Sequence, residues 1–169
     1  PVVVSTHQSA GYRYPVELLV AAVERYDHVV GINLTSPDIA YLAEVLDAGA
    51  GRVDLHVGGP MHALTALALG ANGYLSSEGN LAPRLCVRLV EEWRAGDLAA
   101  AATSFTAILR LYRATQAAGG IVGTKAALRE LGAPGGWPRP PRRTPGDPAV
   151  ATLVGVIREL GLDVDELAG

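Results

Sequence analysis

The stretch that decides the fold is Val29-Val30-Gly31-Ile32-Asn33-Leu34-Thr35-Ser36-Pro37-Asp38. It begins as a short apolar run, rich in β-branched residues and too short for a helix, and it ends in small polar residues. This order is typical of a buried parallel strand whose carboxyl end delivers polar side chains before the next helix. Because the chemistry of α/β proteins gathers at such strand ends, the functional interpretation depends on Asn33.

The pattern of a strand followed by a helix recurs four times, in repeats of about 22 residues. Such repeats favour a parallel sheet with right-handed crossovers. After the second strand, we expect Ser36 to cap the next helix, with Pro37 at its first position. The expected strands are Val2–Thr6, Val29–Asn33, Val53–Val57 and Tyr74–Ser76.

The pattern changes after Ser76, where only helical segments follow. Asp97 is expected to cap the second of them. The expected helices are Pro83–Ala95, Asp97–Ala118, Gly123–Leu131 and Ala149–Leu160, with a Pro/Arg/Gly-rich connector at Pro134–Pro148. The predicted fold is therefore α/β of the (β/α)8 TIM-barrel type, here a half barrel of four βα units (1–80) followed by a helical extension (81–169).

Composition excludes several classes of function. The net charge of −3 gives no electrostatic case for nucleic acid or an acidic membrane as partner. No apolar run reaches the length of a transmembrane helix, and no signal peptide is visible. The single cysteine, Cys86, excludes an internal disulfide framework and fits a reducing compartment, so we expect a cytoplasmic protein.

Four strands alone would leave apolar strand edges unpaired. We therefore expect the first strand to pair with something outside this sequence. The chain begins at Pro1 without a methionine, which suggests a piece of something longer. The expected partner is an N-terminal half barrel on another chain, a homo-oligomer, or both.

Four segments resemble, in order and spacing, the dihydrodipicolinate synthase / N-acetylneuraminate lyase family of barrel aldolases. Residues 31–38 resemble that family's G-I-K-[DE]-[SA]-[ST]-G-D, and residues 57–60 resemble S-G-D-D. Residues 73–76 with 80–83 resemble G-[VY]-I-S…N-x-x-P, and residues 123–128 resemble P-x-K-A-A-L. The resemblance covers nearly the whole chain and implies the C-terminal half of the barrel plus the helical tail.

The resemblance also implies what has changed. The family's G-I-K lysine forms a Schiff base with pyruvate or a related 2-oxo acid; that position is Asn33 here, and an amide cannot form an imine. The family's proton-relaying tyrosine falls at Ser5. The chain's one lysine, Lys125, matches a lysine of the helical tail. A family-based description would read lyase or aldolase, with the chemistry lost or altered.

A ligand pocket could persist without that chemistry. By resemblance, Gly58 and Leu75 lie where the family contacts the carboxylate and carbonyl region of the keto acid. No cofactor is implied, because Gly58-Gly59 lacks the G-x-G-x-x-G dinucleotide pattern. We expect a small oxo-acid or sugar-acid-like ligand among Ser5, Thr6, Asn33, Gly58, Gly59, Leu75 and Ser76, whose polar groups could equally serve capping, turns or internal hydrogen bonds.

Two further residues are candidates for acid–base chemistry, His7 in a loop and Glu78 just past the fourth strand. Glu78 could instead be an exposed surface carboxylate. His56 and His62 could join these two residues as an acid–base or metal site, although the His56 side chain could face the helices. No two of them have helical ligand spacing, so we expect no metal. The basic cluster Arg139, Arg142 and Arg143 is expected to decorate a surface connector.

Overall fold

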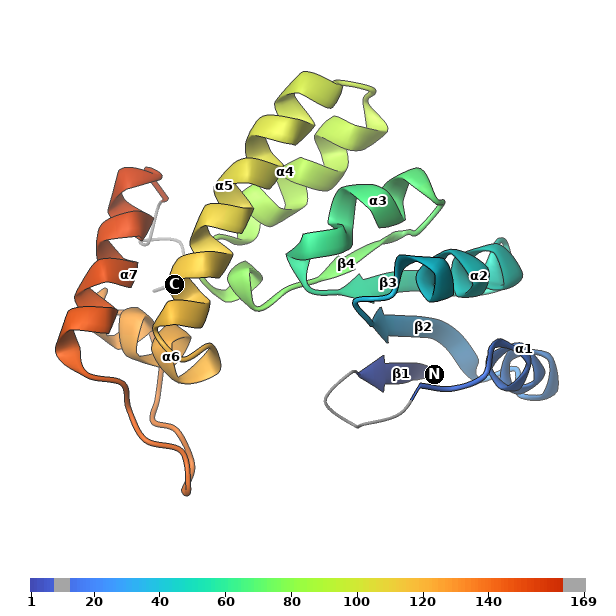
Figure 1. The fold of residues 1–169 in the computed structure, drawn as a ribbon, viewed down its shortest axis with the longest axis horizontal. Helices are drawn as coiled ribbons and strands as arrows, with labels where there is room; N and C mark the ends of the chain where they lie inside the picture. The colour runs from blue at the N-terminus through green and yellow to red at the C-terminus, as the bar shows by residue number, and fades with distance from the viewer. Residues whose placement is uncertain (8–12, 163–169) are drawn as a thin grey trace. The chain divides into compact units, whose positions relative to one another are not determined.

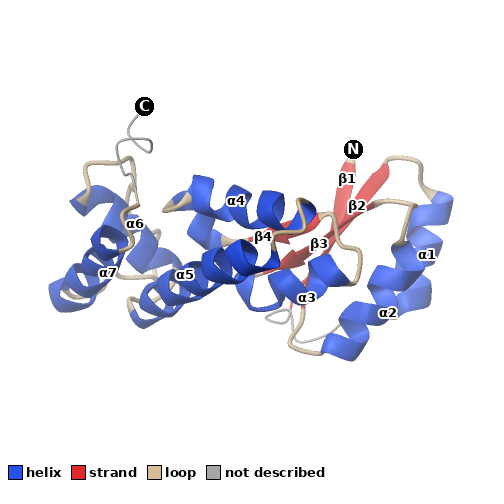
Figure 2. Ribbon diagram, turned by 90° about the horizontal axis from the view of Figure 1, so that it is seen from above, coloured by secondary structure: helices blue, strands red, loops and turns tan. Residues whose placement is uncertain are grey.

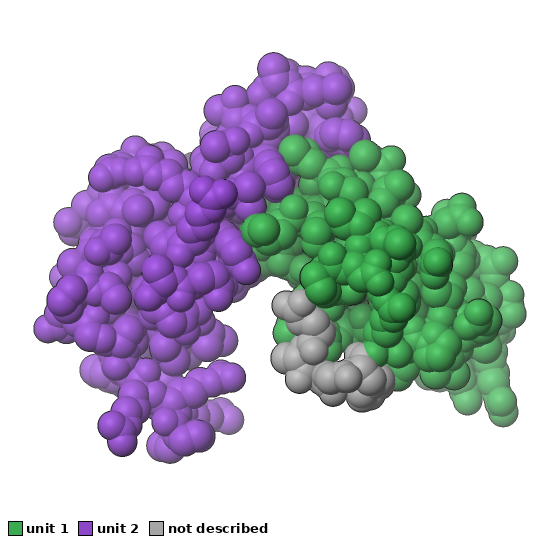
Figure 3. Space-filling view, viewed as in Figure 1, with its two compact units in different colours: residues 1–76 green, residues 77–169 purple. Residues whose placement is uncertain are grey.

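The computed structural model describes residues 1–7 and 13–162. They form two compact units, Pro1–Ser76 and a second unit that begins at Ser77 (Figure 3). Among the described residues, all strands belong to the first unit, and the second consists of helices. The boundary between the two units thus coincides with the change from strands to helices.

The first unit is a sheet of parallel strands in the order β1-β2-β3-β4, with helices along one face (Figures 1 and 2). This confirms the predicted parallel sheet with its strand–helix repeats. The elements are β1 (Val2–His7), α1 (Val16–Arg25), β2 (Val29–Thr35), α2 (Ile39–Gly49), β3 (Asp54–Gly58), the 3-10 helix η2 (Pro60–His62), α3 (Ala63–Ala68) and β4 (Gly73–Leu75).

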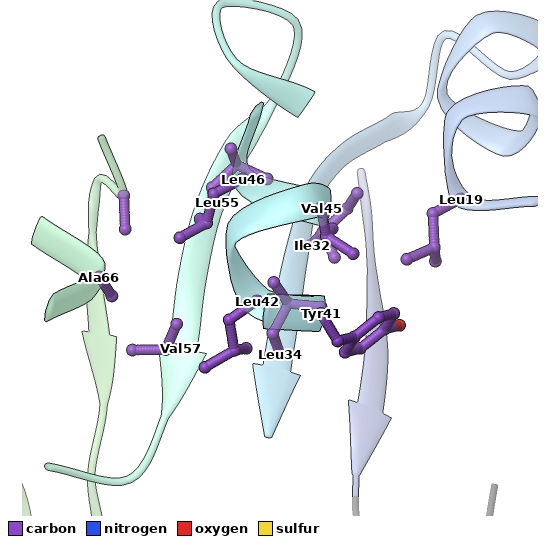
Figure 4. Close-up of a cluster of buried hydrophobic side chains, with 11 residues drawn as sticks. Leu19, Ile32, Leu34, Tyr41, Leu42, Val45, Leu46, Leu55, Val57 and Ala66 are labelled. Atoms are coloured by element: carbon purple, nitrogen blue, oxygen red, sulfur yellow. The ribbon is translucent and has the colours of Figure 1, made fainter. Parts of the chain in front are cut away.

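The core of this unit lies between the sheet and its helices (Figure 4). Ile32 and Leu34 of β2, and Leu55 and Val57 of β3, are each at most 2% exposed. Alternate residues of a strand share a face, so all four side chains point towards the helices. Their helical partners in the cluster are Leu19, Tyr41, Leu42, Val45, Leu46 and Ala66.

The start of α2 differs from the sequence prediction. The N-cap is Asp38, whose carboxylate accepts a hydrogen bond from the Tyr41 backbone N–H at 3.2 Å, so the prediction of Ser36 as N-cap is wrong. The strand runs on to Thr35, which leaves Ser36 and Pro37 in the turn; the Ser36 hydroxyl accepts a hydrogen bond from the Asp38 backbone N–H at 3.2 Å. Asp38 also pairs with Arg13 at 2.5 Å.

The described part of the second unit contains the 3-10 helix η3 and four α-helices. Asp97 caps α5 by accepting a hydrogen bond from the Ala100 backbone N–H at 3.0 Å, as predicted. Fully buried apolar side chains on α4, α5 and α7 form its interior: Leu89, Ile108, Leu111, Leu153 and Ile157. The elements are η3 (Ser77–Asn80), α4 (Pro83–Arg94), α5 (Leu98–Ala117), α6 (Ile121–Glu130) and α7 (Asp147–Glu159).

Two of these helices begin earlier than the sequence predicts, α6 at Ile121 and α7 at Asp147. At α7, Pro148 sits in the first turn, where its missing N–H is tolerated. None of the helices in the described part of the chain is long and apolar enough to cross a membrane.

The cap of α2 gives a pH-dependent prediction. Hydrogen bonding from the Tyr41 backbone and pairing with Arg13 lower the pKa of Asp38 from its ordinary 3.8. A carboxyl with a lowered folded-state pKa stabilises the fold above its unfolded pKa, and the contribution is lost as the pH falls through the folded-state value. Asp38→Asn keeps a capping side chain but removes the charge. Its deficit in free energy of unfolding should therefore be present at neutral pH and shrink below about pH 4.

The measurement is urea denaturation at several pH values. Glu44→Gln removes an exposed carboxylate that does not cap the same helix, and it should cost less at neutral pH. Parallel acid profiles for the wild type and Asp38→Asn would show that the Asp38 charge does not stabilise this end of α2.

Candidate functional site

The strand register brings polar side chains into one row across the sheet. Ser5 of β1 lies opposite Asn33 of β2, Asn33 lies opposite His56 of β3, and His56 lies opposite Gly73 of β4. Register neighbours in a parallel sheet share a face, and these residues alternate with those that pack on the helices. The row therefore lies on the face opposite the core. We call this face, which carries Ser5, Asn33, Thr35 and His56, the polar face.

The nitrogen and the oxygen of the Asn33 side-chain amide differ in their hydrogen bonding. Its Nδ2 donates a hydrogen bond to Ser5 Oγ at 3.2 Å. Its Oδ1 is buried and finds no hydrogen-bond donor in the described part of the chain. A buried acceptor without a donor costs about 1–3 kcal/mol, so this atom would favour a ligand or solvent group that donates to it.

His56 belongs to the polar face rather than to the helix side. A Cβ placed on Gly73 would lie 3.3 Å from His56 Cδ2, so the imidazole lies over Gly73. The neighbouring residues Leu55 and Val57 occupy the core, which fixes the alternation. The sequence left the direction of His56 open. The alternation of buried Leu55 and Val57 around it was the signal that could have settled it.

The carboxyl ends of β2 and β3 meet at Thr35 and Gly58. A Cβ on Gly58 would lie 1.8 Å from Thr35 Oγ1, so only glycine leaves room for the Thr35 hydroxyl there. Gly59 has a φ of 87°, and its N–H donates to the Leu75 carbonyl at 2.7 Å. The Gly59 N–H therefore already has an acceptor within the protein. Thr35 is a polar residue of this edge that the sequence analysis did not single out.

Some of the other candidate residues lie elsewhere. Thr6 is buried on the helix side, where it hydrogen bonds Tyr41; burial raises the pKa of Tyr41, while Thr6 and Arg13 oppose the shift. His7 is the last residue of β1, so the prediction that it lies in a loop is wrong. It is exposed and lies opposite Thr35 in the strand register, which places it on the polar face. Ser76 is half-buried at the end of the first unit. The remainder of the predicted loop after His7, residues 8–12, lies outside the described residues.

Glu78 belongs to the second unit and is fully buried, so the interpretation of it as an exposed surface carboxylate is wrong. The Ser77 hydroxyl donates to Glu78 Oε1 at 3.1 Å. Burial comes from its place in η3, which contacts α4, α5 and α6. His62 is half-buried at the end of η2. Within residues 1–7 and 13–162, no group of three His, Cys, Asp or Glu side chains is arranged to hold a metal ion.

Lys125 lies on α6 in the second unit. Its Nζ donates to the Gly135 carbonyl at 3.0 Å, which ties the helix to the connector that follows it. The one lysine of the chain is therefore on a helix of the second unit. On the polar face, β2 carries the amide of Asn33.

A parallel sheet with helices on one face and polar side chains near the strand ends on the other is typical of α/β proteins of the barrel type. The family model described as the dihydrodipicolinate synthetase family matches residues 7–154. The chain belongs to this family, which confirms the resemblance found in the sequence.

Individual proteins of this family are also similar to the chain in sequence and in structure. The chain is 29% identical to the 4-hydroxy-tetrahydrodipicolinate synthase of Methanopyrus kandleri over 86% of this chain and 49% of that protein. It resembles the solved structure of Escherichia coli K12 YagE in complex with pyruvate, with a TM-score of 0.85, 26% identity, and 96% and 57% of the two chains covered. A monomeric dihydrodipicolinate synthase variant has the same fold, with a TM-score of 0.87, 23% identity, and 95% and 55% coverage.

The chain thus spans about half the length of the relatives it matches. The four parallel strands and the helices of its described residues correspond to about half of barrel proteins of this family, which confirms the predicted fold class.

Proposed function

We propose that this chain supplies the ligand-binding strand ends of a divergent member of the family, and that it binds a small oxo acid or sugar-acid-like molecule without forming an imine. The observation that carries the proposal is the row of Ser5, Asn33 and His56, in which the buried amide oxygen of Asn33 has no donor among the described residues. We place this activity in the cytoplasm.

The polar row supports binding by complementary hydrogen bonds. Asn33 Nδ2 already donates to Ser5 Oγ, so the Ser5 hydroxyl proton is available to donate to a ligand oxygen. Asn33 Oδ1 would accept from a ligand hydroxyl. His56, beside them, can donate or accept a proton. A small acid with oxo and hydroxyl groups matches this set of donors and acceptors.

The loss of imine chemistry rests on the identity of one side chain. An amide nitrogen is not a nucleophile towards a carbonyl, so Asn33 cannot replace an amine. Lys125 lies on α6 in the second unit, where its amine donates a hydrogen bond to the Gly135 carbonyl. By this proposal the chain is a pseudoenzyme with respect to aldol cleavage. An acid–base role for His7 in any turnover is a separate proposal.

Ligand binding is testable by isothermal titration calorimetry of the full chain with pyruvate and with gluconate. We expect saturable binding of at least one of them, and Asn33→Ala should weaken it at least tenfold because both amide contacts are lost. Gln116→Ala, which removes an exposed amide on α5, is the matched control and should bind as the wild type does. Absence of binding to either probe, or equal binding by Asn33→Ala, would contradict the proposal.

Imine formation is testable by borohydride reduction in the presence of pyruvate, followed by mass spectrometry. We expect no covalent adduct on the wild-type chain, because the polar face carries no amine. Asn33→Lys restores an amine at the strand position and should become labelled at residue 33. A reduced adduct on Lys125 of the wild type would show that imine chemistry persists.

A second candidate function is that of a non-catalytic half-barrel subunit. The observation that favours it is β1, which is an edge strand of the sheet in the described part of the chain and carries Val2 and Val3 at 46% and 55% exposure. An unpaired apolar strand edge favours addition of another strand. The occupant would be an N-terminal half barrel on another chain, or a second copy in a homo-oligomer.

Size-exclusion chromatography with light scattering tests this second function. We expect the full chain alone to self-associate through β1, and Val3→Lys on the edge strand to reduce that association. Leu18→Lys places the same charge on an exposed position of α1 and should have less effect. A well-behaved monomer of the wild-type chain would count against an obligatory partner.

A further inference from the structure

Helix α6 and the connector that follows it are rich in basic residues. Residues 121–143 contain Lys125, Arg129, Arg139, Arg142 and Arg143, opposed by one acidic residue, Glu130, whereas the whole chain has a net charge of −3. The polar face uses none of these residues. Their concentration within one unit calls for a separate explanation.

Trp137 lies in the connector, where hydrogen bonds fix the backbone before it while the residue itself is exposed to solvent. Gly135 packs so closely on α6 that a Cβ there would lie 2.1 Å from the Lys125 carbonyl oxygen. Lys125 Nζ donates to the Gly135 carbonyl at 3.0 Å, and Arg129 Nη1 donates to the Gly136 carbonyl at 2.6 Å. These contacts fix the backbone immediately before Trp137, whose side chain is nevertheless 71% exposed.

Arg129 also orients the indole ring. Its guanidinium carbon lies 3.9 Å from the centre of the Trp137 ring, a cation–π contact on one ring face. A large apolar ring normally gains stability by burial, so holding it exposed has a cost. Its remaining surface is thus a fixed aromatic platform.

A cavity of about 540 Å³ lies beside this platform. Its cationic lining comes from Lys125, Arg139 and Arg142, and its apolar lining comes from Trp137, Ile121 and the neighbouring prolines. The volume falls in the range of small-molecule pockets, about 300–1,000 Å³. Arginine pairs readily with carboxylate and phosphate oxygens, and an indole stacks with planar rings.

We propose that this cavity binds a small organic anion that carries a planar aromatic ring. The ring would stack on Trp137, and the acidic group would pair with Arg139 and Arg142. The small-molecule volume of this cavity and the negative net charge of the chain favour a small molecule over an extended polyanion. This site lies wholly within the second unit and does not depend on the function proposed for the polar face.

The test is calorimetric titration of the full chain with three probes: adenosine monophosphate, adenosine and inorganic phosphate. The first has both a ring and a negative charge, and each of the others has one of the two. We expect saturable binding of adenosine monophosphate at millimolar concentration or below, at least tenfold tighter than either control probe. No binding of adenosine monophosphate, or equally tight binding of phosphate, would overturn the proposal.

Variants then locate the site. The double variant Arg139→Gln/Arg142→Gln should lose at least tenfold in affinity for adenosine monophosphate, as should Trp137→Leu. Arg143→Gln removes one neighbouring charge that does not line the cavity, so it should bind as the wild type does. An equal loss in Arg143→Gln would mean that general charge attraction, not the cavity, holds the probe, and would contradict the proposal.

Fluorescence gives a readout that does not rely on these variants. Trp93→Phe leaves Trp137 as the one tryptophan of the chain. Stacking of the adenine ring should quench its emission along the same binding curve that calorimetry gives. Binding without any change in Trp137 emission would place the probe elsewhere and overturn the assignment.

Discussion

The two faces of β2 impose the constraint on which the candidate site depends. Ile32 and Leu34 are buried against the helices, and a strand sends alternate side chains to opposite faces. Asn33, between them, must therefore point away from the core. A shift of one residue would bury the amide among apolar side chains and expose two large apolar residues, so the hydrophobic core itself holds the register.

The parallel pairing then extends this constraint across the sheet. Once Asn33 faces away from the helices, its register neighbours Ser5 and His56 must do so as well. Gly73 leaves space for the imidazole, and Gly58 leaves space for the Thr35 hydroxyl. Apolar packing on one side of the sheet thus positions the polar groups on the other.

The sequence predicted the parts of the fold that local patterns encode. The short apolar runs located all the strands, and Asp97 was identifiable as a cap because a helical stripe follows it directly. The cap of α2 was missed because Ser36, Pro37 and Asp38 are all plausible starts. The choice of Asp38 depends on how far β2 runs and on Arg13, which is distant in sequence.

The site was less predictable for the same reason. The resemblance to a family motif singled out Asn33 as a candidate site residue, but the side to which His56 points depends on its neighbours in the core. Burial of Glu78 depends on three helices packed around η3, and the fixed position of Trp137 depends on carbonyl contacts with Lys125 and Arg129. Such contacts join residues that no periodic pattern links.

The central claim is that Ser5 and Asn33 share the face opposite the core. Cysteine accessibility tests it most directly, with Ser5→Cys, Asn33→Cys, Ile32→Cys and Leu34→Cys each made in a Cys86→Ala background. In the folded chain, a thiol reagent should modify positions 5 and 33 readily, whereas positions 32 and 34 should react only after denaturant is added. Rapid labelling at position 32 or 34, with protection at position 33, would contradict the account.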